Sequence, residues 1–343
     1  MSNIINKIKK NKLPLDRYID LCLYKHKYSY YEKNKIFGPR GDFITSPYIS
    51  SIFGEVISIY ILNYFLSRGI TKFNLLEIGA GEGIMAKDII KTLQKFKNIE
   101  FKYFILEKSK NLIKLQKRSL KKFNIKWIDN LKDFSKKNLF ILSNELFDAF
   151  PVKHFKKLHG NWYEKFIIFD NKKKEIKSQY QKIKKIPSNI FNLCLKNVSF
   201  IEYSPKIFNF LNTISKLIKK HKDNCFLTID YGYYDDYFKD TLQALKKHKK
   251  ISICDDPGNA DITYLVNFKL INQIFKRNGL RNTQILTQSK FLTNNGILIR
   301  LERAKKNLIN EKSFTKLKMA VNRLINPKQM GTLFRVLTVT NEN

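Results

Sequence analysis

The chain is short of cysteine, glycine and proline and has no long apolar run, and each shortage excludes a class of protein. Its 343 residues include four cysteines, with no CxxC pair and no histidine at zinc-ligand spacing to a cysteine. We therefore expect no disulfide framework and no metal site, and a reducing compartment. With 13 Gly and 8 Pro, the chain is neither collagen-like nor of low complexity. No run of about 18 apolar residues occurs, so no membrane span is expected.

Acidic residues are also scarce, because 29 Asp+Glu stand against 65 Lys+Arg and give a net charge of +36. The basic residues are mostly lysines spread along the whole chain, and Ile, Asn, Phe and Tyr are used heavily, as in proteins from AT-rich genomes. We favour a composition bias over a nucleic-acid partner, which stays possible. The basic first twelve residues have neither the apolar segment of a secretory signal nor the Arg and Ser richness of a transit peptide, so we expect a cytoplasmic location.

Apolar residues are abundant enough for a large core, at 43% of the chain with 13% aromatic residues. Short apolar strands alternate with amphipathic helices from residue 73 onward, which predicts an α/β fold with a parallel sheet covered on both faces. The expected strands are 73–78, 101–106, 125–128, 139–142 and 225–229, with a final strand at 333–339. The expected helices are 84–96, 109–123, and others near 205–220, 264–279 and 312–325, and a polar segment is expected to follow the helix near 264–279 and to run to residue 295.

Two regions depart from this rhythm. Residues 14–66 have helical spacing with one loop, and Ser46-Pro47 is expected to open a long apolar helix. Residues 153–180 have the pattern of a β-hairpin around a glycine turn, followed by an exposed lysine-rich continuation. We predict an N-terminal helical part over 1–70, a core over 71–150 and 200–343, and an inserted lobe over 151–199.

The sharpest local signal is a buried strand that ends in three alternating glycines, Gly79, Gly81 and Gly83, before a helix. Glycines at such a turn let the backbone bend tightly and approach a ligand closely. The loop is not the dinucleotide-binding fingerprint, because Ile84 occupies the position of the last glycine in that motif. It also lacks the Gly-Lys-Ser/Thr ending of a phosphate-binding Walker loop.

Two acidic residues accompany the glycine loop. Glu77 precedes it on the same strand, and Glu107 ends the next strand, where a carboxylate can accept hydrogen bonds from both ribose hydroxyls of an adenosine. The combination resembles class I S-adenosylmethionine (SAM) methyltransferases, whose donor has no pyrophosphate and needs no anion-binding helix N-terminus. An ordinary strand-turn-helix, or a site for another nucleotide, is the alternative.

Polar residues follow the strand at 139–142, namely Asn144, Glu145 and Asp148. If a helix starts there, Glu145 and Asp148 share one of its faces. Two carboxylates can clamp a guanidinium, and one of them can take up the proton that this poor nucleophile must lose. The alternative is that Asp148 caps a helix and Glu145 is solvated. Glu202 and Asp230 are weaker candidates, because carboxylates at strand ends often serve only as caps.

More specifically, the chain resembles the MidA family of SAM-dependent methyltransferases, whose mitochondrial members assist assembly of respiratory complex I. The resemblance spans nearly the whole chain in seven ordered blocks. They are Tyr30-Tyr31 with 41–47 and 53–55, then 77–83, 144–152, 162–164, 229–232, 256–263 and 330–334. Ala80 departs mildly from the pattern, since many members have proline there, and the block at 256–263 has no role that we can derive.

The resemblance implies a Rossmann-like core with an added N-terminal helical part and an inserted α+β lobe, and SAM as cofactor. The donor-binding residues that it implies are Glu77, Gly79, Gly81, Gly83 and Glu107, together with Thr45, Ser46 and Pro47 of a loop that folds over donor or substrate. The residues implied at the methyl-transfer site are Asn144, Glu145 and Asp148.

The implied activity is protein arginine N-methylation of a subunit of complex I type, in the cytoplasm, or in the mitochondrial matrix if the source is eukaryotic. Methylation of RNA or of a small molecule is one alternative. RNA is not favoured, because the segment Ser-Asn-Glu-Leu at 143–146 is not the Asn/Asp-Pro-Pro-Tyr type that stacks a base. A non-catalytic assembly factor that binds SAM only to stabilise its fold is the other alternative.

Overall fold

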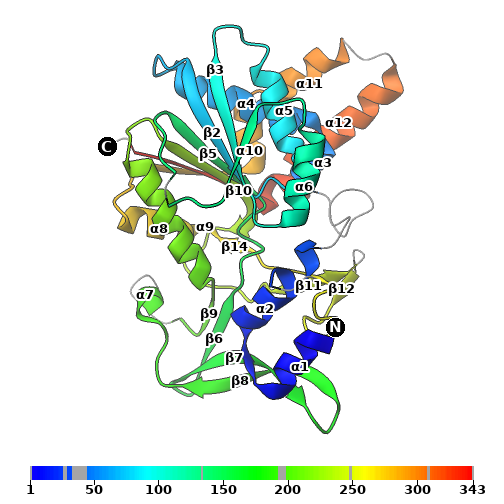
Figure 1. The fold of residues 1–343 in the computed structure, drawn as a ribbon, viewed down its shortest axis with the longest axis vertical. Coiled ribbons are helices and arrows are strands. Elements are labelled where there is room, and N and C mark those ends of the chain that lie inside the picture. The colour runs from blue at the N-terminus through cyan, green and yellow to red at the C-terminus, as the bar shows by residue number, and fades with distance from the viewer. Residues whose placement is uncertain are drawn as a thin grey trace.

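The computed structural model describes residues 2–25, 29–32, 45–132, 134–191, 198–246, 249–306 and 310–341. Figure 1 shows an upper part built on a large twisted sheet and a lower part, here called the small lobe, built on smaller sheets. Within the described residues, no helix combines the length and the apolar character that a membrane crossing requires.

The described strands of the upper part form an eight-stranded sheet in the order β15-β16-β10-β5-β2-β3-β4, with β14 beside β10. The strands are β2 (Lys72–Ile78), β3 (Glu100–Leu106), β4 (Ile125–Ile128), β5 (Leu139–Asn144), β10 (Cys225–Tyr233), β14 (Val266–Asn267), β15 (Thr283–Thr287) and β16 (Phe334–Thr340). Five neighbouring strands, from β4 to β10, run parallel, and β16 runs antiparallel to both β10 and β15. The chain steps outward from β2 to β4 and then returns to the other side of β2 as β5. Ligands of open α/β sheets bind where the strand order reverses in this way.

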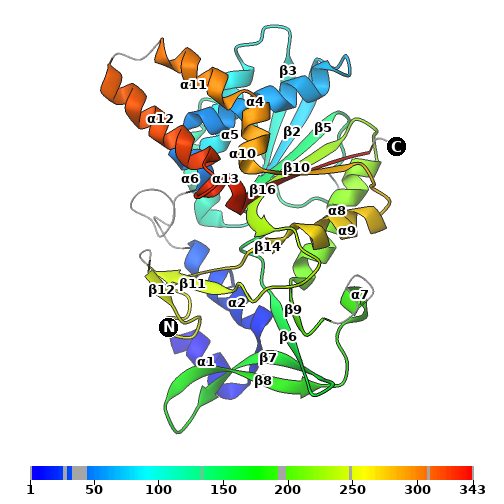
Figure 2. The ribbon, with the colours of Figure 1, turned by 180° about the vertical axis from the view of Figure 1, so that it is seen from behind.

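Alternating apolar residues bury both faces of this sheet. Leu75 and Phe140 pack in one hydrophobic cluster, while their neighbours Leu76 and Ile141 pack in another. Figure 2 shows, on the first face, helices that include α4 and α10 to α13. The helices that cover the sheet are α4 (Ser51–Leu66), α5 (Ile84–Leu93), α6 (Lys110–Ser119), α8 (Pro205–Lys219), α9 (Phe268–Arg277), α10 (Gln288–Asn294), α11 (Ile297–Lys305), α12 (Glu311–Ile325) and α13 (Met330–Leu333).

The small lobe combines segments that are far apart in the sequence. One sheet has the order β1-β7-β6-β9, with β8 on β7, and another has the order β12-β11-β13. The strands are β1 (Leu13–Pro14), β6 (Lys153–Leu158), β7 (Asn161–Asp170), β8 (Glu175–Ile183), β9 (Phe200–Tyr203), β11 (Gln243–Lys246), β12 (Lys249–Ile251) and β13 (Asp261–Thr263). The helices are α1 (Ser2–Lys10), α2 (Leu15–Leu23), the 3-10 turn η1 (Tyr30–Glu32) and α7 (Ser188–Phe191).

These pairings cross the boundaries that the sequence suggested. Pro14 of β1 lies opposite Phe166 of β7, so a strand from the N-terminal part joins the sheet of the inserted lobe. The cluster on the second face of the large sheet includes Phe226 of β10 and continues into the small lobe through Phe155 and Ile201. The division at residues 70, 150 and 199 stays a prediction.

Three local predictions were wrong. The helix expected from Ser46 is two helices, α3 (Ser46–Ile49) and α4, because Ser50 is extended (φ −160°) and its hydroxyl caps α4 by accepting from Ile52 N at 3.2 Å. The helix expected from 264 begins only at Phe268, because the Asn267 side chain accepts from the N–H groups of Lys269 and Leu270. The expected polar segment before residue 295 contains β15 and α10.

Candidate active site

The predicted site residues gather at the carboxyl ends of β2, β3, β5 and β10, beside the point where the strand order reverses. The chain leaves β5 at this edge and continues into β6 of the small lobe (Figure 1). Residues of both parts therefore meet at the position where open α/β sheets bind ligands.

The loop between β2 and α5 requires its glycines. Gly79, Gly81 and Gly83 have φ values of 72°, 55° and 83°, which side-chain-bearing residues rarely adopt. A Cβ on Gly79 would also lie 2.9 Å from Leu146 Cδ1. The glycines thus let the loop bend beside the turn that follows β5.

Glu107 is held in place by backbone and side-chain donors. Its Oε1 accepts the N–H groups of Lys108 at 2.8 Å and Ser109 at 3.0 Å. Burial raises the pKa of this carboxyl, and those hydrogen bonds oppose part of the rise.

Gln116 of α6 links Glu107 to the glycine loop, and sequence reasoning missed it. Its Nε2 donates to Gly81 O at 2.8 Å and approaches Glu107 Oε2 at 3.4 Å, while its Oε1 accepts from Trp127 Nε1 at 2.9 Å. The sequence signal that would have pointed to it is its position four residues after Leu112, on the apolar face of an otherwise basic helix, and the structure shows both side chains buried.

Glu77 lies on the same strand but has a partner within the sheet. The Tyr103 hydroxyl donates to its Oε2 at 2.7 Å, and burial raises its pKa to about 7. Its predicted contact with the donor stays a prediction.

The segment after β5 is a turn and not the helix start that the face-sharing argument assumed. Glu145 has φ 50°, and its N–H donates to Ile229 O at 2.8 Å. Asp230 Oδ2 accepts three successive N–H groups, from Leu146 at 3.1 Å, Phe147 at 2.7 Å and Asp148 at 3.3 Å. The Asp230 carboxylate therefore holds the turn that carries Asp148, which agrees with the capping role considered for it.

Glu145 brings two predicted segments together. Its Oε1 accepts from Ser46 N at 3.0 Å and from Asn144 Nδ2 at 2.9 Å. Burial raises its pKa to about 8, and the charge of Asp148 adds to the rise. Thr45 and Pro47 flank Ser46 at the start of α3, whereas residues 41–44 of the same sequence block lie outside the described residues.

Asp148 has a buried oxygen that is available to a ligand. Burial raises the pKa of its carboxyl to about 6, although a hydrogen bond from Tyr231 opposes part of the rise. Among the described residues, Asp148 Oδ1 and Asn144 Oδ1 are buried without a hydrogen-bond partner. Buried polar atoms of this kind cost free energy unless a donor reaches them, so the pair fits a ligand rich in N–H groups.

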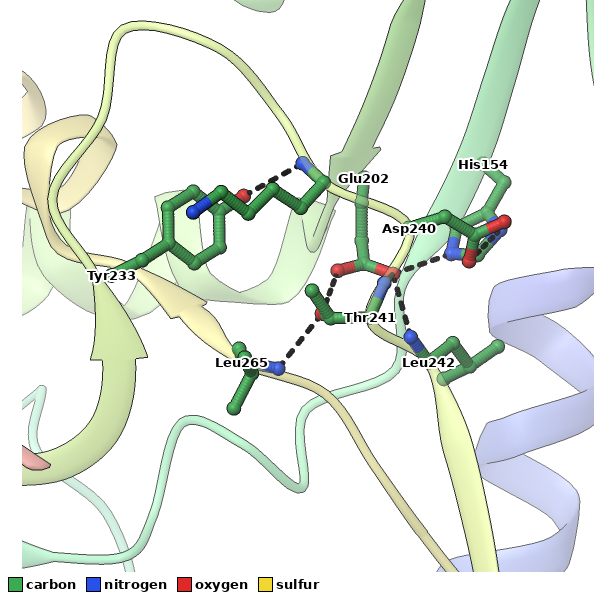
Figure 3. A network of polar contacts seen from close by, with 8 residues as sticks. His154, Glu202, Tyr233, Asp240, Thr241, Leu242 and Leu265 are labelled. Carbon is green, nitrogen blue, oxygen red and sulfur yellow. Dashed lines mark hydrogen bonds and ion pairs between the residues drawn. The ribbon is translucent and has the colours of Figure 1, made fainter. Parts of the chain in front are cut away.

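Glu202, His154 and Asp240 form a separate polar network within the small lobe (Figure 3). His154 Nε2 lies 2.7 Å from Glu202 Oε2, and His154 Nδ1 lies 3.9 Å from Asp240 Oδ1. Both oxygens of Glu202 also accept from the chain at 241–242, through the hydroxyl and N–H of Thr241 and the N–H of Leu242. We therefore interpret Glu202 as a structural anchor and not as part of the active site.

Comparison with known proteins decides the family. A family model of S-adenosyl-L-methionine-dependent methyltransferases matches residues 56–286. The chain belongs to this family. SAM is accordingly its methyl donor, and the family that the sequence blocks indicated is confirmed.

The names of similar proteins agree with this assignment. The chain is 28% identical to the mitochondrial protein arginine methyltransferase NDUFAF7 homolog of Drosophila melanogaster, over 95% of this chain and 81% of the relative. It is also 28% identical to the mitochondrial NDUFAF7 protein arginine methyltransferase of Homo sapiens, over 89% and 75%.

A solved structure supports the fold. The crystal structure of a COG1565 superfamily methyltransferase from Burkholderia thailandensis, bound to S-adenosyl-homocysteine, has a TM-score of 0.84 and 22% identity, and the match covers 99% of this chain and 92% of that one. The predicted α/β methyltransferase fold is therefore confirmed, while the roles assigned to individual residues stay predictions.

Proposed function

We propose that this methyltransferase methylates the side chain of arginine in a protein. The observation that carries the proposal is a set of three carboxyl groups beside the glycine loop, those of Glu145 and Asp148 in the turn after β5 and that of Asp230 on β10, which binds the turn. Among the described residues none of the three forms an ion pair, and burial raises the pKa of each. A buried acidic cluster of this kind is stabilised by a cation that enters with the substrate.

The relatives support this choice of substrate, because the similar proteins of fly and human are named protein arginine methyltransferases. Their names also say mitochondrial, so we propose the mitochondrial matrix if this chain is eukaryotic and the cytoplasm otherwise. A protein subunit of complex I type stays the proposed target.

In this proposal the donor lies against the glycine loop. Gly79, Gly81 and Gly83 have positive φ angles and carry no side chains that would intrude on the donor. Glu107, held in place by Gln116, accepts hydrogen bonds from the ribose hydroxyls. Glu77 supports the loop from its strand, and Thr45, Ser46 and Pro47 cover the site from α3. The bound donor supplies an electrophilic methyl group.

The acceptor guanidinium lies against the turn at 144–148. Asp148 Oδ1 and Asn144 Oδ1 accept hydrogen bonds from its N–H groups and orient one nitrogen. Glu145 accepts the proton that this nitrogen loses as it gains the methyl group. The hydrogen bond from Ser46 N holds Glu145 in position for this step.

The test compares Glu145→Gln with Glu175→Gln, a control at the exposed start of β8. Each protein is incubated with SAM and an arginine-containing peptide, methyl transfer is followed by mass spectrometry, and SAM affinity is measured by calorimetry with NAD as the negative control. We expect Glu145→Gln to lose at least 100-fold in rate and to bind SAM as the wild type does.

Three outcomes would contradict the proposal. Wild-type turnover by Glu145→Gln would remove the proposed base. Tight SAM binding by the wild type, with methylation of RNA or small molecules and none of arginine, would assign the site to another acceptor. SAM binding with no turnover of any acceptor would leave the non-catalytic assembly factor.

A further inference from the structure

Two stacked tyrosines of the small lobe contact the loops around the active site. The Tyr24 hydroxyl, at the end of α2, donates to Ala149 O at 2.8 Å, directly after Asp148. The Tyr24 ring stacks on Tyr31, with ring centroids 5.3 Å apart and an interplanar angle of 16°. The carbonyl of Tyr31 accepts from Ser109 Oγ at 3.0 Å, two residues after Glu107. The stacked pair therefore bridges the turn after β5 and the segment after β3.

A carboxylate of the small lobe faces the same tyrosines. Asp261 starts β13, which packs against α2, and its side chain is buried. Burial is the main cause that raises the pKa values of Tyr24, Tyr31 and Tyr231. The negative charges of Asp148 and Asp261 raise all three pKa values further. The packing of β13 on α2 places Asp261 beside the helix that ends at Tyr24, and the hydrogen bond from Tyr24 to Ala149 places the same ring beside Asp148.

The group combines buried acceptors with one accessible ring. Tyr24 has 37% of its surface exposed, although it contacts the turn of Asp148. Asp148 Oδ1 and, four residues earlier in the same segment, Asn144 Oδ1 are buried without a hydrogen-bond partner among the described residues. A ligand with several N–H donors would supply the hydrogen bonds that these two atoms lack.

The chemistry of this group selects for a planar cation. A guanidinium can stack on an aromatic face while its edges donate to carboxylates on two sides, which a compact ammonium cannot do equally well. We propose that Tyr24 and Asp261 form, together with Asp148, the subsite that receives the guanidinium of the substrate. The small lobe then determines the preference for arginine over lysine. This inference rests on the proposed arginine methylation and adds the residues that select the acceptor.

The test uses the full chain and two probes, the peptide Gly-Gly-Arg-Gly-Gly and its lysine counterpart. The variants are Asp261→Asn, Tyr24→Leu and Tyr24→Phe, and the control is Asp236→Asn, whose side chain is 63% exposed and pairs with Lys269. Methylation kinetics give KM and kcat for each peptide. Calorimetry gives SAM affinity and, on protein loaded with S-adenosyl-homocysteine, peptide affinity.

We expect Asp261→Asn and Tyr24→Leu to raise KM for the arginine peptide at least tenfold, with SAM affinity within twofold of the wild type. Tyr24→Phe keeps the ring and is expected to retain KM within about threefold. The Asp236→Asn control is expected to match the wild type. Unchanged SAM affinity shows that each variant is folded, and the partly exposed Tyr24 is a second position to test if Asp261→Asn does not fold.

The outcomes separate this inference from the function on which it rests. If the wild type methylates the arginine peptide and both Asp261→Asn and Tyr24→Leu keep its KM, the subsite is overturned and the function stands. If the wild type neither binds nor methylates the arginine peptide, the proposed function fails and the subsite fails with it.

Discussion

At the scale of the residue, Glu145 combines an uncommon backbone angle with an uncommon pKa. A glutamate at φ 50° is strained by roughly 1 kcal/mol, and it stays in this conformation because Ile229 O and Ser46 N fix it from two sides. Its carboxyl is desolvated, and its pKa of about 8 lies near the pH at which a proton acceptor works best. The site is thus built at the expense of stability.

That cost predicts how stability depends on pH. The folded pKa of about 8 lies above the ordinary value of 4.5, so the folded protein holds a proton that the unfolded chain releases. The wild type therefore loses stability as the pH rises from about 5 to 8. We expect Glu145→Gln to be roughly 1–3 kcal/mol more stable than the wild type at pH 8 and equal to it near pH 4. Urea unfolding at several pH values measures the difference, and parallel curves for the two proteins would contradict it.

The glycine loop allows a matched pair of substitutions. Gly79 and Gly160 have φ values of 72° and 77°, but only at Gly79 does a Cβ meet another side chain, Leu146. Both changes to alanine are expected to cost roughly 1 kcal/mol of stability through backbone strain. Only Gly79→Ala is expected to weaken SAM binding, at least tenfold, because it fills the loop. Calorimetric titration with SAM decides, and equal affinities in the two variants would remove Gly79 from the donor site.

At the scale of the element, α6 organises the donor site from outside the glycine motif. Replacing Gln116 by leucine removes the hydrogen bond to Gly81 O and the approach to Glu107 while keeping the side chain buried. We expect SAM affinity to fall about tenfold, roughly the 1.4 kcal/mol of one or two hydrogen bonds. Lys114→Leu, on the exposed side of the same helix, is the control. Unchanged affinity in Gln116→Leu would show that Glu107 needs no support from α6.

The elements that sequence patterns predicted best are those with purely local causes. The strand at 125–128 agrees residue for residue, and the glycines after β2 mark the loop, because apolar runs and φ-permissive residues depend on near neighbours. The turn at 145–148 was not predictable, since it is held by Asp230, more than 80 residues away. Local caps also decided boundaries: Ser50 divided a continuous apolar stretch, and Asn267 delayed a helix.

At the scale of the whole molecule, the small lobe was the least predictable part. Its sheets join β1 to β7 and β11 to β13, and no periodicity in a sequence window reports which distant strands pair. The consequence concerns the site. Of the two residues that we assign to the acceptor subsite, Asp261 lies in the sequence block at 256–263, for which no role could be derived, and Tyr24 lies in none of the blocks. They become candidates only in the fold, where Tyr24 binds Ala149 next to Asp148 and the strand of Asp261 packs against the helix that ends at Tyr24.

The network in Figure 3 is what ties three of these distant segments together. Glu202 on β9 binds His154 on β6 and the chain at 241–242, and the paired side chains of Glu202 and His154 are almost fully buried. Replacing Glu202 by leucine leaves donors without an acceptor, so we expect a loss of roughly 3–5 kcal/mol of stability. SAM affinity below the unfolding transition should be retained, because the glycine loop lies in the other part of the molecule.

Because both Glu202 oxygens already accept hydrogen bonds, we expect added Zn²⁺ to leave the melting temperature of the wild type unchanged. A clear rise with Zn²⁺, lost in His154→Ala, would instead show that the cluster of His154, Glu202 and Asp240 is a metal site.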